Sequence, residues 1–151
     1  MKLVRTTSEH PDFIALVRQL DEYLAGVNGE SHSFFAQFNK IDMLKHTVVA
    51  YIDDAPIGCG AFKAYDADAA EIKRMFVQPA FRGRGVASAV LKALETWAAE
   101  EGFTACILET GSHMPDAVAL YAARGYNVTA KYGQYVDSPL SVCMRKDTLS
   151  H

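Results

Sequence analysis

A basic, glycine-rich segment has the residue types and spacing of a phosphate-binding turn. It reads Arg82-Gly83-Arg84-Gly85-Val86-Ala87-Ser88, and a helical pattern over 84–101 starts within it. Glycines let a backbone wrap closely round a ligand, and the unpaired N–H groups of a helix N-terminus attract anions. Arg82 and Arg84 add positive charge and forked donors. The segment therefore predicts a site for a phosphate-bearing ligand.

The charge of this region contrasts with the charge of the whole chain. The 151 residues contain 15 Lys and Arg against 18 Asp and Glu, a formal net charge of −3. Residues 71–92, however, carry five basic side chains against one acidic side chain, Glu71. A local positive patch in a mildly acidic protein favours a small polyphosphate as the ligand, and the acidic balance argues against general nucleic-acid binding.

Three interpretations of the turn compete. A P-loop needs Gly-Lys-Ser/Thr at the helix start, which is absent. A dinucleotide site is suggested by the spacing Gly83-x-Gly85-x-x-Ser88 and by Glu109 at the end of the next strand, where a ribose-binding acid would stand. Against it, residues 78–82 separate the preceding strand from the first glycine, and only one crossover follows. The third interpretation is that the glycines serve a tight turn alone.

The composition is typical of one soluble globular domain, expected over 1–151. Half the residues are hydrophobic and 22% are charged. No apolar run approaches the roughly 20 residues of a membrane span, so neither a transmembrane helix nor a signal peptide is expected. Cys59, Cys106 and Cys143 stand singly in apolar stretches without zinc-ligand spacing. We expect buried, reduced cysteines, no metal site, no membrane partner and a cytoplasmic location.

The elements that must position the turn are read from periodicity and from turn residues. Helices are expected over 9–26, 33–38, 84–101 and 115–124, and strands over 2–6, 47–52, 57–65, 70–77, 104–108, 127–132 and 140–145. Residues 53–56 form a turn, which predicts a hairpin. The strand, helix and strand from 70 to 108 form a right-handed crossover with parallel strands. In helix 84–101 the apolar stripe contains Val90, Leu94, Trp97 and Ala98, with Glu95 lying off it.

At the glycine-rich turn the sequence resembles the GNAT superfamily of acyl-CoA-dependent N-acetyltransferases. The family signature is Gln/Arg-x-x-Gly-x-Gly/Ala, and residues 82–87 match it, with Ala87 in the last position. The resemblance extends upstream over 70–79 and downstream over 117–126, and the element order fits over nearly the whole chain. It implies an α/β (α+β) fold with a mixed, centrally splayed sheet of about 6–7 strands flanked by helices.

The resemblance also implies how acetyl-CoA is bound as cosubstrate. The cofactor enters between strands 70–77 and 104–110, and the pyrophosphate lies on the turn. Main-chain groups of Met75, Phe76 and Val77 pair with the pantetheine arm like an added strand. The residues implied at the turn are Arg82, Gly83, Arg84, Gly85, Val86, Ala87 and Ser88.

Acetyl transfer to an amine needs a base for the ammonium and a proton donor for the leaving thiolate. Glu71 is the candidate base by its spacing to Arg82. An ordinary glutamate is a weak base for an ammonium, so a water relay or burial is expected. The alternative for Glu71 is a solvated glutamate that pairs with Lys73. Glu109 is a second candidate base, or a cap on its strand.

Tyr121 is the candidate acid, because the family often places a tyrosine beside the CoA sulfur in the last short helix. The alternative for Tyr121 is a core residue. Many family members carry Asn earlier in that helix to bind the cofactor, and Asp116 stands near that position. An ionised Asp accepts but does not donate. His113, a loop histidine near the site in sequence, receives no role.

The acceptor side is expected along 28–35 and 132–138, which mix aromatic residues with the carboxylates Glu30 and Asp137. The leading hypothesis is an N-acetyltransferase in which a primary amine, of a small molecule or a protein, attacks acetyl-CoA directly in a ternary complex. The alternatives are a non-catalytic acyl-CoA-binding module and, third, a nucleotide-dependent oxidoreductase. Dimers are common among relatives, so a homodimer fits the resemblance.

Overall fold

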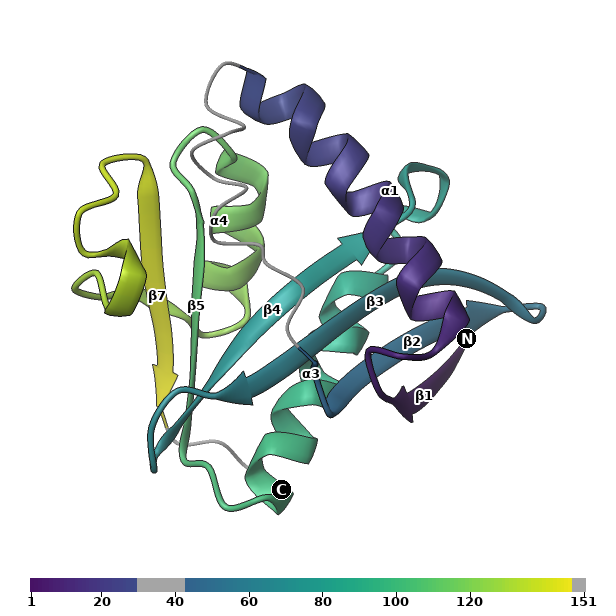
Figure 1. Cartoon of the computed structure of the whole chain (residues 1–151), viewed down its shortest axis with the longest axis horizontal. Helices are drawn as coiled ribbons and strands as arrows, with labels where there is room; N and C mark the ends of the chain where they lie inside the picture. Colours follow the sequence, from purple (N-terminus) through teal and green to yellow (C-terminus); the bar gives the residue numbers. More distant parts are fainter. Residues whose placement is uncertain (30–42, 148–151) are drawn as a thin grey trace. The chain divides into compact units, whose positions relative to one another are not determined.

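A computed structural model of the chain describes residues 1–29 and 43–147. Seven strands form a mixed sheet in the order β1-β2-β3-β4-β5-β7-β6 (Figure 1). Three α-helices flank the sheet within the described residues. The predicted α/β class with a mixed sheet is therefore confirmed. The helix expected over 33–38 lies outside the described residues.

The strands are β1 (Lys2–Thr6), β2 (His46–Ile52), β3 (Ala55–Ala64), β4 (Ala69–Val77), β5 (Ala105–Gly111), β6 (Asn127–Val128) and β7 (Ser141–Asp147). The α-helices are α1 (Pro11–Asn28), α3 (Val86–Glu100) and α4 (Pro115–Ala123). Two short 3₁₀ helices, η2 (Pro79–Phe81) and η3 (Gly133–Tyr135), complete the described elements. No helix in these residues has both the length and the apolar character that a membrane span requires.

The chain forms two compact units. The first unit comprises Met1–Ala61 and Arg74–Leu94, and the second comprises Phe62–Lys73 and Glu95–His151. Strand β4 and helix α3 each contribute residues to both units.

Helix α1 supplies much of the core of the first unit. The side chain of His10 accepts the N–H of Asp12 at 3.1 Å, and Pro11 occupies the first turn, where its missing N–H costs nothing. The apolar face of α1 packs across β2 and β3 (Figure 1). Its buried residues are Phe13, Leu16 and Leu20. The helix continues past the expected stop at Gly26 and ends before Gly29, which has a φ of 52°.

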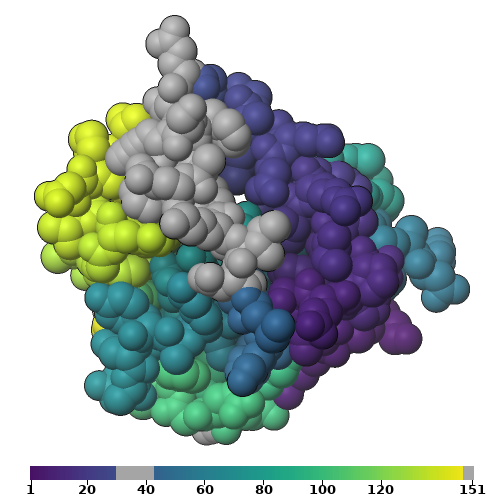
Figure 2. All heavy atoms as spheres, in the orientation of Figure 1, coloured from purple at the N-terminus to yellow at the C-terminus, as the bar shows by residue number. Residues whose placement is uncertain are grey.

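The β2–β3 hairpin is tighter than predicted. Only Asp53 and Asp54 form the turn, with φ values of 50° and 64°, as in the two-residue turns that suit twisted hairpins. Pro56, expected in the turn, instead lies near the start of β3, a position that strands tolerate. The exposed turn projects from the surface at the right of Figure 2.

In the second unit, β4 and β5 are parallel neighbours, as predicted. Ala69 pairs with Ala105, and Glu71 pairs with Ile107. Strand β7 runs antiparallel to β5 from Ala105↔Asp147 to Gly111↔Ser141. The strand expected over 127–132 is wrong in length, because only Asn127 and Val128 pair with β7 before the chain turns into η3.

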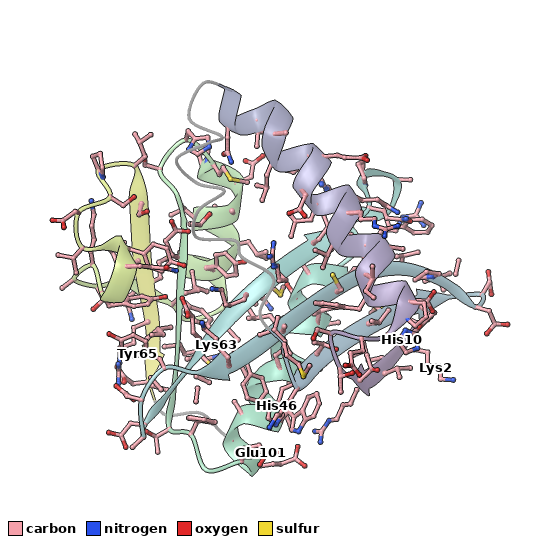
Figure 3. The ribbon with its side chains drawn as sticks, viewed as in Figure 1. Lys2, His10, His46, Lys63, Tyr65 and Glu101 are labelled. Carbon is pink, nitrogen blue, oxygen red and sulfur yellow. The ribbon has the colours of Figure 1, made fainter. Side chains whose placement is uncertain are left out.

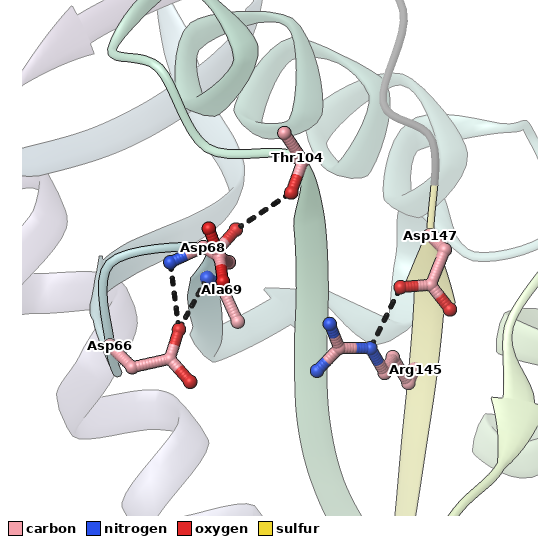
Figure 4. Close-up of polar contacts among 6 residues, drawn as sticks. All are labelled: Asp66, Asp68, Ala69, Thr104, Arg145 and Asp147. Atoms are coloured by element: carbon pink, nitrogen blue, oxygen red, sulfur yellow. Dashed lines mark hydrogen bonds and ion pairs between the residues drawn. The ribbon is translucent and has the colours of Figure 1, made fainter.

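The β3–β4 connection is held to the start of β5 by a compact polar turn (Figure 4). A carboxylate oxygen of Asp66 accepts the N–H groups of Asp68 at 2.8 Å and Ala69 at 2.7 Å. These bonds lower the pKa of Asp66. The carbonyl of Asp68 in turn accepts the N–H groups of Thr104 at 2.9 Å and Ala105 at 3.1 Å. The turn thereby fixes the register that carries Glu71.

Candidate active site

The glycine-rich turn carries a run of main-chain donors. Gly83 and Gly85 both have a φ of 78°, and a Cβ on either would meet no heavy atom within 4 Å. Among the described residues, the N–H groups from Gly83 to Ser88 have no hydrogen-bond acceptor, and the first bonded amide is Ala89 N–H to Gly85 O at 3.0 Å. Helix α3 begins at Val86, two residues later than expected. The turn is therefore open and rich in donors, as an anion site requires.

The two arginines of the turn have different surroundings. Arg82 donates from Nε to the carbonyl of Val77 at 3.0 Å, and its guanidinium lies 4.6 Å from the ring centroid of Tyr23. Arg84 is exposed, with its guanidinium 5.4 Å from the ring of Phe81. Both arginines are exposed, and Arg82 is in addition tied to the end of β4 and to α1.

The second half of β4 packs closely on β3 through two glycines that the sequence analysis did not single out. A Cβ on Gly60 would lie 2.5 Å from Sδ of Met75 and 2.9 Å from Leu94. A Cβ on Gly58 would lie 3.0 Å from Val86 and 3.2 Å from the carbonyl of Phe76. Both glycines therefore let β4 and α3 approach β3 more closely than a larger residue would allow.

Arg74 has a φ of 60° inside β4, an unusual backbone conformation for a non-glycine residue. It directly precedes Met75, Phe76 and Val77 in the strand.

Helix α1 braces this half of β4, a role that the sequence did not reveal. Asp21 pairs with Arg74 at 3.3 Å, and Gln19 accepts from Gln78 at 3.0 Å. The ring of Tyr23 lies under the guanidinium of Arg82. These three α1 residues read in the sequence as an ordinary solvated helix face, because their partners are more than 50 residues away.

Glu71 is buried in the second unit, with 5% of its surface exposed. Its carboxylate accepts the hydroxyl of Tyr132 at 3.0 Å. The ring of Tyr132 packs edge-on against Tyr65 at 5.0 Å and against Tyr135 at 5.4 Å. Figure 3 labels Tyr65 on the side of the yellow C-terminal segment. The alternative of a solvated Glu71 is therefore wrong, and the burial expected for a base is present.

Glu109 forms a second carboxylate centre on β5. Ser141 donates to it at 2.6 Å, and the hydroxyls of Ser138 and Ser141 are 2.5 Å apart. Burial raises the pKa of Glu109, and the charge of Glu71 adds to this rise, while the Ser141 bond and Lys73 oppose it. Glu109 lies two residues beyond Ile107, the β5 partner of Glu71. The two carboxyl groups therefore interact electrostatically, and both remain candidate bases.

Tyr121 is a buried residue of α4. Its hydroxyl has no hydrogen-bond partner among the described residues, and burial raises its pKa to about 12. Tyr121 is therefore protonated at neutral pH and can donate. Asp116 lies exposed in the first turn of the same helix. His113 is exposed, and its imidazole ring lies over Gly111.

The two segments expected to line the acceptor side, 28–35 and 132–138, are described by the structure to different extents. Only Asn28 and Gly29 of segment 28–35 belong to the described residues, so Glu30 lies outside them. Segment 132–138 brings Tyr132 and Tyr135 to the carboxylates, as described for Glu71, but Asp137 is exposed.

The cysteines are free and buried, as predicted. Burial raises the pKa of Cys59 and of Cys106 to about 12, so both are thiols at neutral pH. Within the described residues, no group of three or more His, Cys, Asp or Glu side chains has a metal-binding arrangement.

Comparison with known proteins gives consistent results. The model of the acetyltransferase (GNAT) family matches residues 13–126. A protein of Azospirillum brasilense named IAA acetyltransferase is 33% identical over 138 residues, covering 88% of each chain. A candidate acyl-CoA N-acyltransferase from Klebsiella pneumoniae is similar in structure, with 26% identity, 97% coverage of both chains and a TM-score of 0.80.

A more distant solved structure shares the fold. PaiA N-acetyltransferase from Thermoplasma acidophilum, solved in complex with coenzyme A, is 18% identical with a TM-score of 0.71. The match covers 97% of this chain and 98% of that one.

Proposed function

Because the chain belongs to the GNAT family of acetyltransferases, we propose that it transfers the acetyl group of acetyl-CoA to a primary amine by direct attack in a ternary complex. The observation that carries this proposal is the open run of unpaired amides from Gly83 to Ser88 at the start of α3. A helix N-terminus with free donors and two nearby arginines suits a pyrophosphate.

In this proposal the cofactor lies along β4 and the turn. The pyrophosphate accepts the turn amides, and Arg84 faces it with its exposed guanidinium. Arg82, held at Nε by Val77, contributes its remaining donors and its charge. The pantetheine arm pairs with main-chain groups of Met75, Phe76 and Val77. This is supported by the limited parallel pairing of β4 with β5, which covers Ala69 to Glu71.

In the reaction the nitrogen of the acceptor ammonium loses two protons, and the leaving thiolate gains one. The ammonium gives its first proton to Glu71, directly or through a water, and the free amine attacks the thioester carbon. A C–N bond forms as the C–S bond breaks, and Tyr121 protonates the departing thiolate. The second proton leaves the nitrogen as the amide forms and restores the phenol of Tyr121, and Glu71 releases the first proton to solvent. Tyr121 suits this role because its buried phenol keeps its proton at neutral pH and has no competing acceptor among the described residues.

Glu109 is the second candidate for the base. The raised pKa of Glu109 lies closer to neutral pH than the pKa of an ordinary glutamate, and a general base works best when its pKa is near the pH of the reaction. Glu71, in contrast, is bonded to Tyr132, whose ring packs against Tyr65 and Tyr135. This cluster of three tyrosine rings suits an amine with an apolar or aromatic body. We therefore assign proton removal to Glu71 and treat Glu109 as the alternative that mutagenesis separates.

The test is an acceptor screen that measures free thiol from acetyl-CoA and longer acyl-CoAs, with product masses recorded. We expect thiol release that depends on an added amine and a mass gain of one acyl group on that amine. Calorimetric binding of acetyl-CoA without release under every acceptor, small amines and lysine peptides included, would instead identify a non-catalytic acyl-CoA-binding module.

A further inference from the structure

Glu95 is a buried carboxylate that none of the proposed steps uses. It was expected to lie off the buried stripe of α3, which is wrong, because only 9% of its surface is exposed. Its two oxygens each have a donor: the hydroxyl of Tyr126 at 2.8 Å and the ammonium of Lys146 at 2.9 Å. A buried carboxylate is tolerated when it is paired and hydrogen-bonded in this way. The three residues come from α3, from the loop after α4 and from β7.

Tyr126 is the aromatic member of this group, and its side chain is held in place by several contacts. Only 2% of its surface is exposed. Its ring lies 5.9 Å from Nζ of Lys146, and burial and the charge of Glu95 raise the pKa of its phenol, which therefore remains a donor. Gly125, which precedes it, has a φ of 96° and ends α4. The orientation of the Tyr126 ring is thus fixed at both ends, by the backbone turn and by the Glu95 bond.

Tyr126 contacts Tyr121 in two ways. The main-chain N–H of Tyr126 donates to the carbonyl of Tyr121 at 3.0 Å. The two rings pack edge to face, with centroids 5.9 Å apart and an interplanar angle of 66°. Tyr121 itself has no hydroxyl partner among the described residues, and α4 has only nine residues and no side-chain cap. The placement of the Tyr121 hydroxyl therefore depends on packing against an anchored neighbour.

We propose that Tyr126, anchored by Glu95 and Lys146, is a positioning residue that aims the hydroxyl of Tyr121 at the leaving thiolate. This inference rests on the proposed function for the role of Tyr121. A reacting group must be held within about 0.5 Å of its productive position, and a misplacement of about 1 Å costs up to about 100-fold in rate. Removing the anchor while keeping the ring should therefore loosen Tyr121 without removing it.

The first experiment compares Tyr126→Phe with the matched control Tyr51→Phe. Tyr51 donates to Asp12 at 2.6 Å in the first unit, so the control also removes a tyrosine–carboxylate bond. We expect Tyr126→Phe to lower kcat about tenfold with the KM for acetyl-CoA unchanged, a split that indicates a transition-state contribution. Tyr51→Phe should leave both constants unchanged. Unchanged kcat in Tyr126→Phe, or an equal loss in the control, would overturn the inference.

A double-mutant cycle tests whether Tyr126 acts through Tyr121. In a Tyr121→Phe background, Tyr126→Phe should cause no further loss of kcat, because there is no hydroxyl left to aim. The same fold loss in both backgrounds would show that Tyr126 acts elsewhere, and the inference would be wrong.

A readout without turnover separates this inference from the proposed function. In protein labelled with ¹³C on tyrosine rings, the Tyr121 signal is assigned by its loss in Tyr121→Phe. We expect it to shift or broaden in Tyr126→Phe and to stay unchanged in Tyr51→Phe. An unmoved signal would overturn the positioning role even in an active enzyme. If no amine supports thiol release by the wild type, the proposed function fails, and the spectra still decide whether Tyr126 positions Tyr121.

Discussion

The glycine-rich turn of the first unit and the carboxylate centres of the second unit are built in different ways. At the turn, the functional groups are main-chain amides, and two glycines with a φ of 78° present them with no side chain in the way. In the second unit, the groups are carboxylates whose hydroxyl and ammonium donors lie 31 to 61 residues away in sequence. The turn thus depends on local backbone geometry, and the carboxylate centres depend on tertiary packing.

The largest expected effect comes from breaking the backbone geometry of the turn. Gly85→Val should weaken CoA binding at least about 100-fold, because a β-branched residue at this φ is strongly disfavoured and must move the amides. The fold should persist, since no neighbouring atom would be struck. Calorimetry with CoA measures the loss.

The matched control is Gly26→Val on α1, where a Cβ also meets open space but no positive φ is involved. We expect unchanged CoA affinity in this control. Equal affinity in Gly85→Val and the wild type would remove the turn from the cofactor site.

The next effect tests which carboxylate of the second unit accepts the proton. Glu71→Gln should lower kcat about 100-fold, in line with the loss of a general base, and Glu109→Gln should lower it less than about tenfold. Both variants keep an oxygen acceptor for their hydroxyl partners, Tyr132 and Ser141. Steady-state rates with the best amine from the screen decide the order, and a reversed order assigns the base to Glu109.

A smaller loss of rate is expected from the proton donor. Tyr121→Phe should lower kcat by about 10- to 100-fold and leave the affinity for acetyl-CoA nearly unchanged, because its hydroxyl acts on the leaving thiolate. Stopped-assay rates and calorimetry on the same preparation separate the two quantities. Rates equal to those of the wild type would make Tyr121 a core residue only.

The smallest effect is on stability, and its sign follows from the raised pKa of Glu109. At pH values between the ordinary pKa of a glutamate and the raised pKa of Glu109, the folded state binds more protons than the unfolded state. The contribution of Glu109 to the free energy of unfolding therefore falls as pH rises through this range. Glu109→Gln should therefore raise the unfolding temperature, relative to the wild type, by more at pH 7.5 than at pH 4. Calorimetric melting at both pH values measures it, and an equal shift at both would contradict the pKa direction.

The sequence predicted the framework of the fold closely. The parallel β4–β5 pair and the helix after the turn were recognisable because their signals are short-range: apolar periodicity, glycine stops and turn residues. The errors fall at element ends. Asn127 and Val128 form a shorter strand than expected, because the chain leaves β7 to form the turn that carries Tyr132.

The site was only partly predictable, because its contacts join residues that are far apart in the sequence. Glu71 and Glu109 were candidates by position, but their burial and partners were not visible in the sequence. Glu95 was assigned to the wrong side of its helix, because a charged residue normally faces solvent and its donors, Tyr126 and Lys146, lie 31 and 51 residues away. Tyr23 and Asp21, which brace the turn and β4, gave no distinguishing pattern at all.

By itself, the sequence determined the glycine-rich turn, since positive φ at Gly83 and Gly85 and the start of a helix are properties of a few consecutive residues. Tertiary structure alone decided which carboxylates are buried and which hydroxyls reach them. Glu71, Glu95 and Glu109 differ little in local sequence signal, and desolvation and hydrogen bonding, which distinguish them, exist only once distant segments have packed together.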